Sequence, residues 1–293
     1  MSSYQKSKME QFLANELFSP LPKSRQSFTY LMNAIALGFT FVALIPLLSI
    51  LWEIIARGIS GLKLEMFFNP VIDFGFGNAI LGTATIVTIA ALLSVPVGTF
   101  TGIFLAEFGR TNPAANFVRF ITNILTGVPS IIVGVFAYGI IVLVTKQFSA
   151  IAGGFALATI MLPVIVLTTE EALKLVPTDQ RLASAALGGN RLQTTFRIVV
   201  TAALPTITTG ILLAVARAAG ETAPLLVTAL FSLDWSEGLL GPTASLPVLI
   251  YNLYNDPDPQ KYQLVWTTSI VLLALVLFVS IISRLLTRKR KIK

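Results

Sequence analysis

Long uncharged runs constrain this chain more than any other feature of its sequence. Five stretches of 22 to 33 residues contain no Asp, Glu, Lys or Arg, and a sixth, residues 198–233, is interrupted only by Arg217 and Glu221. About 20 apolar residues in a helix cross the hydrocarbon core of a bilayer. No run alternates with the period of two that a transmembrane barrel strand needs. The pattern predicts an all-α membrane protein whose six transmembrane helices cover about residues 28–54, 78–106, 119–145, 149–170, 204–230 and 263–285.

The side-chain inventory argues against covalent chemistry. Only 12% of the residues are charged, against roughly 25% in a soluble domain. The chain has no cysteine and no histidine, so it lacks the usual ligands of zinc and haem and the usual acid–base residue at neutral pH. It also has no GxxxxGKS/T loop to hold the phosphates of ATP. We therefore expect no enzyme activity, no catalytic residue, no metal site and no cofactor in this chain.

The positive charges indicate how the spans are oriented. If the N-terminus is cytoplasmic, 16 of the 21 Lys and Arg residues fall on the cytoplasmic side, and only Arg57, Lys63, Lys146 and Lys261 fall outside. Cytoplasmic loops carry such an excess, so both termini are predicted to be cytoplasmic. The net charge of +7 then reflects membrane topology, and we expect no binding of nucleic acid. The predicted organisation is a cytoplasmic segment without a cleaved signal (1–27), a six-helix domain (28–286) with a cytoplasmic loop (171–203) and a periplasmic loop (231–262), and a basic tail (287–293).

The cytoplasmic loop contains signals for two short helices. Gly188-Gly189 can end a helix that begins near Thr178. Asn190 is a candidate N-cap for a second helix, with Gln193 at the reciprocal capping position. The apolar face of that second helix is expected to consist of Leu192, Phe196 and Val199. From these residues alone the loop is either a docking element for a partner or an amphipathic connector that lies on the membrane.

The same loop resembles the EAA loop of permeases in ATP-binding-cassette importers. That family pattern is Glu-Ala-Ala, three residues, Gly, nine residues, Ile, one residue and Leu-Pro. Here it falls on residues 182–201, with Gly188 and Ile198 at matching positions, Leu182 in place of Glu and Thr201 in place of Pro. The resemblance implies the type I importer permease fold. It also implies a coupling loop that fits a cleft in an ATPase subunit and includes Ala183, Ser184, Gly188, Gly189, Leu192, Phe196 and Ile198.

A second group of motifs matches a narrower family of proteins. Residues 217–225 read Arg-Ala-Ala-Gly-Glu-Thr-Ala-Pro-Leu, residues 127–131 read Gly-Val-Pro-Ser-Ile, and residues 245–247 read Ser-Leu-Pro. Together they resemble the PstA-type permeases of bacterial phosphate importers. This resemblance implies a multi-pass permease of the bacterial inner membrane with inorganic phosphate as its substrate. It implies as partners two ATPase subunits that bind the ATP, a second permease and a periplasmic phosphate-binding protein.

Arg217 and Glu221 are the charges of the fifth predicted span. Arg217 lies 12 residues beyond Pro205, which places it roughly 18 Å along the helix and near the bilayer midplane. Glu221 follows at i+4 on the same face. One interpretation is a structural pair that reduces the cost of a lone membrane arginine, at least ~2.5 kcal/mol. The other is an anion site in the substrate path, where the guanidinium binds phosphate oxygens and Glu221 accepts a hydrogen bond from a protonated one.

Other features are expected to be structural. Gly98-x-x-x-Gly102 allows a close helix approach, and Pro129 is expected to make a packing kink. Glu107 and Glu170 are expected to be solvated charges at the cytoplasmic ends of spans two and four. Three alternative functions stay open: a permease for another anion or small solute, a stand-alone transporter or channel, and a membrane assembly factor. The motif at 217–225 disfavours the first, and no internal repeat of the kind seen in secondary transporters supports the second.

Overall fold

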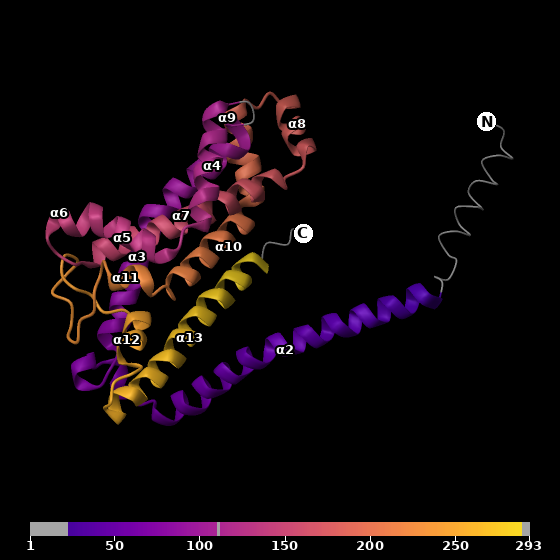
Figure 1. Cartoon of the computed structure of the whole chain (residues 1–293). Coiled ribbons are helices and arrows are strands. Elements are labelled where there is room, and N and C mark those ends of the chain that lie inside the picture. Colours follow the sequence, from indigo (N-terminus) through magenta and orange to yellow (C-terminus); the bar gives the residue numbers. More distant parts are fainter. Residues whose placement is uncertain (1–22, 110–111, 289–293) are drawn as a thin grey trace, which may run out of the picture. The chain divides into compact units, whose positions relative to one another are not determined.

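The computed structural model describes residues 23–109 and 112–288, and within them it contains helices and turns but no strand (Figure 1). The predicted all-α membrane fold is thereby confirmed. The chain divides into two compact units, with the boundary after Glu53. Most of the predicted segment 1–27 and of the basic tail 287–293 lies outside the described residues, as does Arg110.

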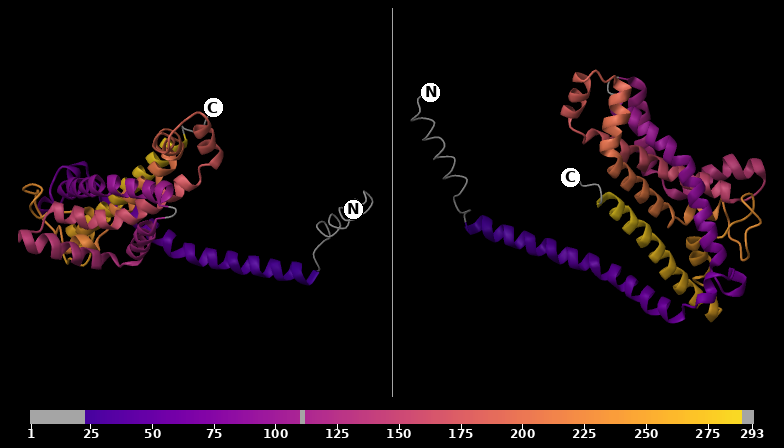
Figure 2. Two further views of the ribbon diagram at one scale, coloured as in Figure 1. Left: turned by 90° about the horizontal axis from the view of Figure 1, so that it is seen from above. Right: turned by 180° about the vertical axis from the view of Figure 1, so that it is seen from behind.

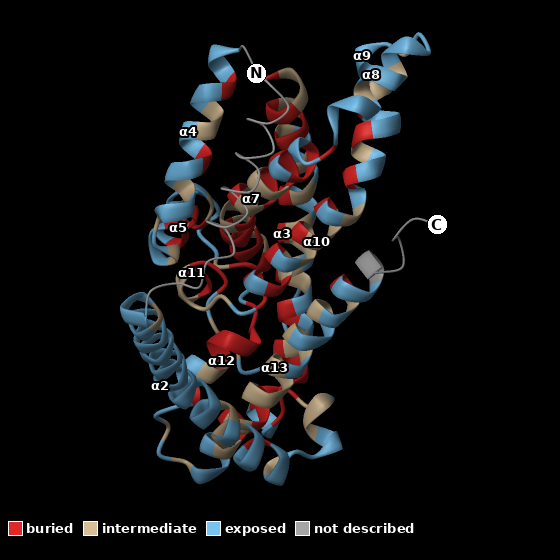
Figure 3. Cartoon of the chain, turned by 90° about the vertical axis from the view of Figure 1, so that its right-hand side faces the viewer, coloured by how far each residue is buried: buried red, intermediate tan, exposed pale blue. Residues whose placement is uncertain are grey.

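The first unit, as described, is one stretch of helix. Its residues 23–53 belong to α2 (Lys23–Gly61), which extends beyond both limits predicted for the first span. Nearly every side chain of this stretch is exposed (Figure 3), including the large apolar groups of Phe39, Phe41 and Trp52. A helix that is apolar on all sides is typical of a membrane span, because its side chains are unfavourable in water and favourable against lipid or another apolar surface.

The second unit contains the remaining helices. In chain order they are α3 (Gly77–Ile103), α4 (Pro113–Gly127), α5 (Ser130–Ala137), α6 (Leu143–Thr145), α7 (Ala150–Lys174), α8 (Thr178–Ala186), α9 (Arg191–Gln193), α10 (Val200–Ala218), α11 (Ala223–Leu226), α12 (Leu246–Leu253) and α13 (Pro259–Arg288). Short 3-10 turns lie at η1 (Leu64–Phe67) and η2 (Val71–Asp73). Wider π-helical turns lie at η3 (Phe104–Phe108), η4 (Tyr138–Val142) and η5 (Thr194–Val199).

Helix α7 is the centre of the second unit. It packs most extensively against α3 and next against α10, and α10 in turn lies beside α13 (Figures 1 and 2). Ile86, Leu157, Met161 and Ile165 fill the space between these helices and are at most 1% exposed. The burial of these four side chains at one contact region holds α3 and α7 together, since packed apolar groups are the main source of cohesion in a core.

The glycine pair of α3 makes that contact close. A Cβ atom at Gly102 would lie 2.6 Å from the Cβ of Thr169, and one at Gly98 would lie 2.8 Å from a methyl group of Ile165. Both distances are shorter than real side chains tolerate, so only glycine fits at either position. The close approach predicted from Gly98-x-x-x-Gly102 is confirmed, and its partner is α7.

Five of the six predicted spans are recovered as single long helices, and the sixth corresponds to two helices with a sharp bend between them. Five helices in the described part of the chain are long and apolar enough to cross a membrane: Lys23–Gly61, Gly77–Phe108, Ala150–Lys174, Arg191–Ala218 and Pro259–Leu285. The predicted third span, 119–145, corresponds to Pro113–Gly127 followed by Ser130–Thr145, which meet at an angle of 109°. The break falls at Pro129, so the expected packing kink is in fact a sharp reversal. Pro129 removes a backbone donor, and α4 ends at Gly127 just before it.

The predicted limits of the fifth span are wrong. The span was placed at 204–230, whereas the long helix runs from Arg191 to Ala218. The helix starts early because Asn190 and Gln193 form a capping box, and it stops early where Gly220 and Pro224 follow, residues that disfavour helix continuation. The predicted cytoplasmic loop 171–203 is also shorter, because α7 continues to Lys174 and only residues 175–190 lie between the long helices. The predicted loop 231–262 contains α12 and the first turn of α13.

Candidate substrate path and coupling loop

Arg217 and Glu221 lie at the end of the fifth span. Arg217 is in the last turn of α10, and Glu221 follows the helix end at Ala218. The guanidinium Nε of Arg217 lies 3.6 Å from Oε1 of Glu221. The side chain of Arg217 is 63% exposed and that of Glu221 is 17% exposed. The predicted pairing is therefore present, but Arg217 is not in the middle of a helix as the sequence had placed it.

The pair lines a cavity of about 240 Å³. The opposite wall is the break in the third span, with Thr126, Pro129 and Ser130. The hydroxyl of Thr126 donates to the carbonyl of Asn123 at 2.6 Å. Helix α5 begins at Ser130, and the amides of Ser130 and Ile131 are the ones without an intrahelical acceptor, because the amide of Ile132 donates to the Pro129 carbonyl at 3.0 Å. The cavity thus combines one guanidinium, one carboxylate, two hydroxyls and the positive end of a short helix, a set of groups suited to an oxyanion.

Sequence reasoning singled out Arg217 and Glu221 and, in the Gly-Val-Pro-Ser-Ile motif, Ser130, but it missed Thr126 as a lining residue. Thr126 and Ser130 flank the Gly-Val-Pro triplet at 127–129, which signalled the break in the helix. That signal was interpreted as a packing kink, because a proline alone does not reveal how far two helical halves diverge. The bend of 109° is what brings the residues around it to the wall of the cavity.

The coupling loop has the glycine corner that its sequence predicts. Helix α8 ends near Gly188, whose φ of +80° is the left-handed conformation that favours glycine. A Cβ at Gly189 would lie 2.6 Å from Oγ of Ser184. After the corner, Asn190 and Gln193 cap each other, with the Gln193 amide 2.8 Å from Oδ1 of Asn190. The second helix of the predicted pair is not short, however, because it continues through α9 and η5 into the fifth span.

The π-helical turn η5 changes which residues share a face. Leu192 and Phe196 are exposed, at 59% and 46%, whereas Val199 is fully buried. The predicted single apolar face of Leu192, Phe196 and Val199 is therefore wrong, because a π turn contains an extra residue and rotates the side chains that follow it. Ile198, also predicted for the coupling loop, is 38% exposed. The most exposed apolar side chains of the loop are Leu187 at 90%, Leu175 at 77% and Leu182 at 67%. Ala183 and Ser184 lie on α8 after Leu182.

The two carboxylates at the helix ends predicted to be cytoplasmic are not solvated. The side chain of Glu107 is 9% exposed, and its Oε1 lies 2.7 Å from a guanidinium nitrogen of Arg181. The side chain of Glu170 is 2% exposed and pairs with Arg119 at 2.8 Å and with Lys174 at 3.0 Å. The expectation of solvated charges is wrong because Arg181 and Arg119 come from elsewhere in the fold, where no local pattern reveals them; Lys174 alone is a local partner, at i+4 from Glu170.

Comparison with known proteins gives consistent results. A family model described as "Binding-protein-dependent transport system inner membrane component" matches residues 98–292. The phosphate transport system permease protein PstA of Yersinia pestis is 37% identical over 92% of this chain and 94% of its own length. The protein of the same name from Haemophilus influenzae is 39% identical over 88% of this chain and 95% of its own length.

Two solved structures have a similar fold at low sequence identity. An inward-facing MetNI methionine transporter superposes with a TM-score of 0.60 and 19% identity, covering 78% of this chain and 99% of the other. A bacterial alginate transporter, in complex with an alginate-bound periplasmic protein, superposes with a TM-score of 0.68 and 13% identity, covering 91% and 96%. Both are ATP-binding-cassette transporters, and at this identity the likeness concerns the fold alone.

Proposed function

The chain belongs to the binding-protein-dependent transport system inner membrane components, and within them to the PstA-type phosphate transport system permeases. From that premise we propose that it forms part of the path by which inorganic phosphate is imported. It is a multi-pass permease subunit of the inner membrane. What the proposal adds is the substrate, the residues that handle it and the partners that supply the energy.

The observation that carries the proposal is the half-engaged guanidinium of Arg217. Its contact with Glu221 is long at 3.6 Å, and 63% of the side chain is exposed beside the cavity. A guanidinium presents a planar fork of donors that matches two oxygens of a phosphate group. The hydroxyl of Ser130 lies at the same cavity and adds a donor of the kind that binds oxyanions, whereas the hydroxyl of Thr126 already donates to the Asn123 carbonyl. The cavity is therefore suited to a small tetrahedral anion.

Glu221 gives the site a way to select among such anions. Inorganic phosphate carries a proton at neutral pH, and a carboxylate can accept a hydrogen bond from that O–H group. Sulfate carries no proton at this pH, so the same carboxylate repels it. Specificity of this kind, in which one group attracts the right ligand and repels a near copy, is a common device in binding sites.

The energy for transport is assigned to partner subunits. The exposed Leu182 and Leu187 give α8 an apolar surface for docking on an ATPase, and ATP is bound and hydrolysed there and not by this chain. The high exposure of Arg217 in a single chain leaves room for a second permease to complete the site. The assembly in this proposal has two permeases, two ATPase subunits and a periplasmic phosphate-binding protein, and it works by alternating access.

Reconstitution tests the proposal directly. The chain is placed in proteoliposomes with the ATPase, the second permease and the phosphate-binding protein of the same system, and uptake of radiolabelled phosphate is measured. We expect ATP-dependent uptake that an excess of sulfate does not reduce. Uptake without the ATPase would indicate a stand-alone transporter instead. ATP-dependent uptake of sulfate but not of phosphate would indicate an importer for another anion.

Labelling of single cysteines tests the proposed orientation, since the natural chain has none. Cysteines at Ser60 and Ser236, both exposed, are expected to react with an impermeant thiol reagent in intact cells. A cysteine at Thr178, which begins α8, is expected to react only after the membrane is opened. Labelling of position 178 from outside would reverse the topology and remove the docking argument.

A further inference from the structure

Three arginines from three separate elements meet at the π-helical turn η3, which ends the second span. Arg119 of α4 donates from Nη2 to the carbonyl of Leu105 at 2.8 Å. Arg181 of α8 donates from Nη2 to the Glu107 carboxylate at 2.7 Å. Arg191, the first residue of α9, donates to the Glu107 carbonyl. We call η3 and these three arginines the π-turn hub.

The chemistry of a helix end explains why η3 attracts cations. The last four carbonyls of a helix have no intrahelical donor, and the helix dipole places partial negative charge there. A π turn is wider than an α turn, and such turns occur mostly at functional sites. Glu107 adds a full negative charge to this end, and its side chain is 9% exposed. The three guanidinium groups therefore satisfy groups that would otherwise be buried or half-buried without partners.

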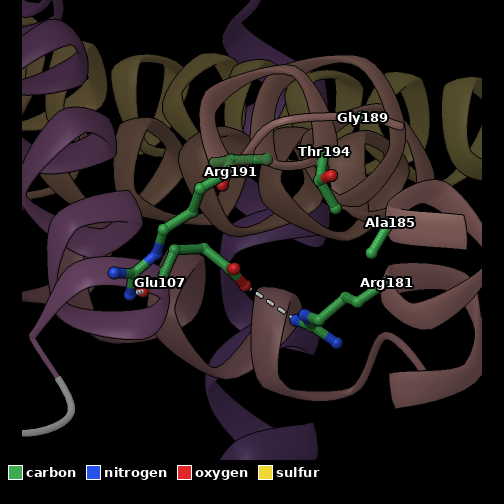
Figure 4. A pocket seen from close by; sticks show the side chains of 7 residues that line it. Glu107, Arg181, Ala185, Gly189, Arg191 and Thr194 are labelled. Carbon is green, nitrogen blue, oxygen red and sulfur yellow. Dashed lines mark hydrogen bonds and ion pairs between the residues drawn. The ribbon is translucent and has the colours of Figure 1, made fainter. Parts of the chain in front are cut away.

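The contact between α8 and the hub is largely shielded from solvent. The side chain of Arg181 is 17% exposed, and besides Glu107 it donates to the carbonyls of Leu173, at 3.0 Å, and Val176. These carbonyls belong to the end of α7 and the turn after it. Figure 4 shows Arg181 and Arg191 approaching Glu107 from opposite sides of a cavity of about 360 Å³. Since a buried charge-assisted bond has few alternatives, a shift of α8 is expected to move Glu107 as well.

The hub connects onward to the substrate cavity through α4. Besides Leu105, Arg119 binds Oε1 of Glu170 at 2.8 Å, and the Glu170 side chain is 2% exposed. Helix α4 has 15 residues, which correspond to about 22 Å of stiff rod. It ends at Gly127, next to the break that lines the cavity with Arg217 and Glu221. A continuous chain of contacts therefore runs from α8 through η3 and α4 to that cavity.

We propose that Arg181, Glu107 and Arg119 are positioning residues that transmit a displacement of α8 to α4 and so to the cavity at Thr126 and Ser130. This inference rests on the proposed function, because it assumes that α8 docks on an ATPase. It adds a route by which ATP-driven movement reaches the substrate path within this one chain. The contacts between the elements of this route are ion pairs. An ion pair is either formed or broken, so a movement of α8 is expected to change the route between two discrete arrangements and not to bend it gradually.

The test is a double-mutant cycle on the whole complex. Glu107→Gln, Arg181→Gln and the double variant are reconstituted with all partners. The stimulation of ATPase activity by phosphate-loaded binding protein and the phosphate taken up per ATP are measured. We expect each single variant to assemble and to lose stimulation about 5-fold or more, the usual lower range for a coupling between sites. The double variant is expected to be no worse than either single one, because both act through one contact.

Arg197→Gln is the matched control, since Arg197 is an exposed arginine of the same segment that lies outside the hub. Full stimulation in the assembled Glu107→Gln and Arg181→Gln variants, or losses that simply add in the double variant, would overturn the proposal. If the glutamine variants fail to assemble, Arg119→Lys decides, because lysine keeps the charge but cannot reach Leu105 and Glu170 as a fork. Unchanged coupling in an assembled Arg119→Lys complex would also overturn it. A wild-type complex without ATP-driven uptake would instead refute the proposed function, and this inference with it.

Discussion

Two of the arginine–glutamate pairs in the described part of the chain differ in almost every physical respect. Arg181 and Glu107 lie 2.7 Å apart with side chains 17% and 9% exposed, and the guanidinium is also bound to backbone carbonyls. Arg217 and Glu221 lie 3.6 Å apart, with the arginine 63% exposed at the wall of a cavity. The first pair has used most of its hydrogen-bonding capacity, with the buried Nε of Arg181 left without a partner, whereas the second pair has kept most of its capacity.

This difference separates a positioning role from a ligand-binding role. A guanidinium has five N–H donors, and one whose donors are already engaged inside the protein cannot bind an anion without breaking those bonds. A guanidinium with a single long contact can take an oxyanion at little cost. Exposure and free donors, more than the identity of the charges, therefore indicate which of two similar pairs handles the substrate.

The largest effect is expected at the open pair. Arg217→Gln should lower phosphate uptake at least ~30-fold while the ATPase still co-purifies, because losing one partner of a close charge pair costs about 2 kcal/mol or more. Adding Glu221→Leu should not restore uptake, although it would if the pair were only a structural strut. Arg217→Lys should be partial, since the fork is lost. Uptake of radiolabelled phosphate is the measurement, and wild-type uptake by assembled Arg217→Gln would remove Arg217 from the path.

The next largest effect is expected at Glu170, the buried carboxylate that pairs with Arg119 of the hub. Arg119→Met leaves Glu170, 2% exposed, with only Lys174 as a charged partner. Breaking a buried pair from one side costs about 3 kcal/mol, which corresponds to a fall of about 6 °C or more in the thermal midpoint. Adding Glu170→Leu should recover much of that loss, because no buried charge is then unpaired. An Arg119→Met complex that melts with the wild type in a thermal-shift measurement would contradict this account.

The sequence predicted features that depend on neighbouring residues. Runs without charge located the spans, and the capping signals at Asn190 and Gln193 located a helix start that the structure confirms. The spacing of Gly98 and Gly102 indicated a close helix contact. Each of these signals acts within one helix or one turn, so a single stretch of sequence contains all of it.

Features that depend on distant residues could not be predicted in this way. Glu107 and Arg181 are 74 residues apart, and nothing near either one marks the other as its partner. The limits of the fifth span failed for a related reason, because residues 219–230 carry a single charge, Glu221, whether or not they are helical. The residues that line the cavity were half predicted: the charges stood out, while the positions of Thr126 and Ser130 depend on an angle that only the fold determines.

A smaller effect is expected at the glycine corner, which holds α8 in place. Gly188→Val puts a β-branched residue at a φ of +80°, a strain of about 1–2 kcal/mol. No atom lies within 4 Å of a Cβ there, so the strain is in the backbone alone. Co-purification of the ATPase should fall several-fold, and Gly188→Asn should retain most of it because asparagine tolerates this conformation.

The matched control for the corner is Gly238→Val. Gly238 has a φ of +126° and likewise nothing within 4 Å of a Cβ, but it lies in the predicted periplasmic loop. Strain there should leave ATPase binding unchanged. Equal losses in the two valine variants would mean that backbone strain acts on the whole fold and not on the docking helix.

The smallest effect is expected at the ion pair of Lys261 and Asp256, which tests whether exposure alone makes a pair functional. Lys261 is in the first turn of α13, and Asp256 is in the loop before that helix. The two charged groups lie 3.1 Å apart, and their side chains are 39% and 20% exposed. The Asp258 amide, which donates to Asp256, and then the Lys261 ammonium hold the pKa of Asp256 below its usual value. Neither Lys261 nor Asp256 is among the residues that line the cavity with Arg217.

Asp256→Asn should therefore leave phosphate uptake within about 2-fold of the wild type, as expected for an exposed pair. Because the pKa of Asp256 is lower in the folded protein than in the unfolded chain, its contribution to stability is complete above the unfolded value of about 3.9 and is lost as the pH falls through the folded value. The thermal midpoint of the wild type should drop more steeply than that of Asp256→Asn when the pH is lowered below about 4. A severe loss of uptake in Asp256→Asn would mean that an accessible ion pair affects transport even when it lies away from the cavity. The position of Arg217 at the cavity would then not distinguish it from other charged residues.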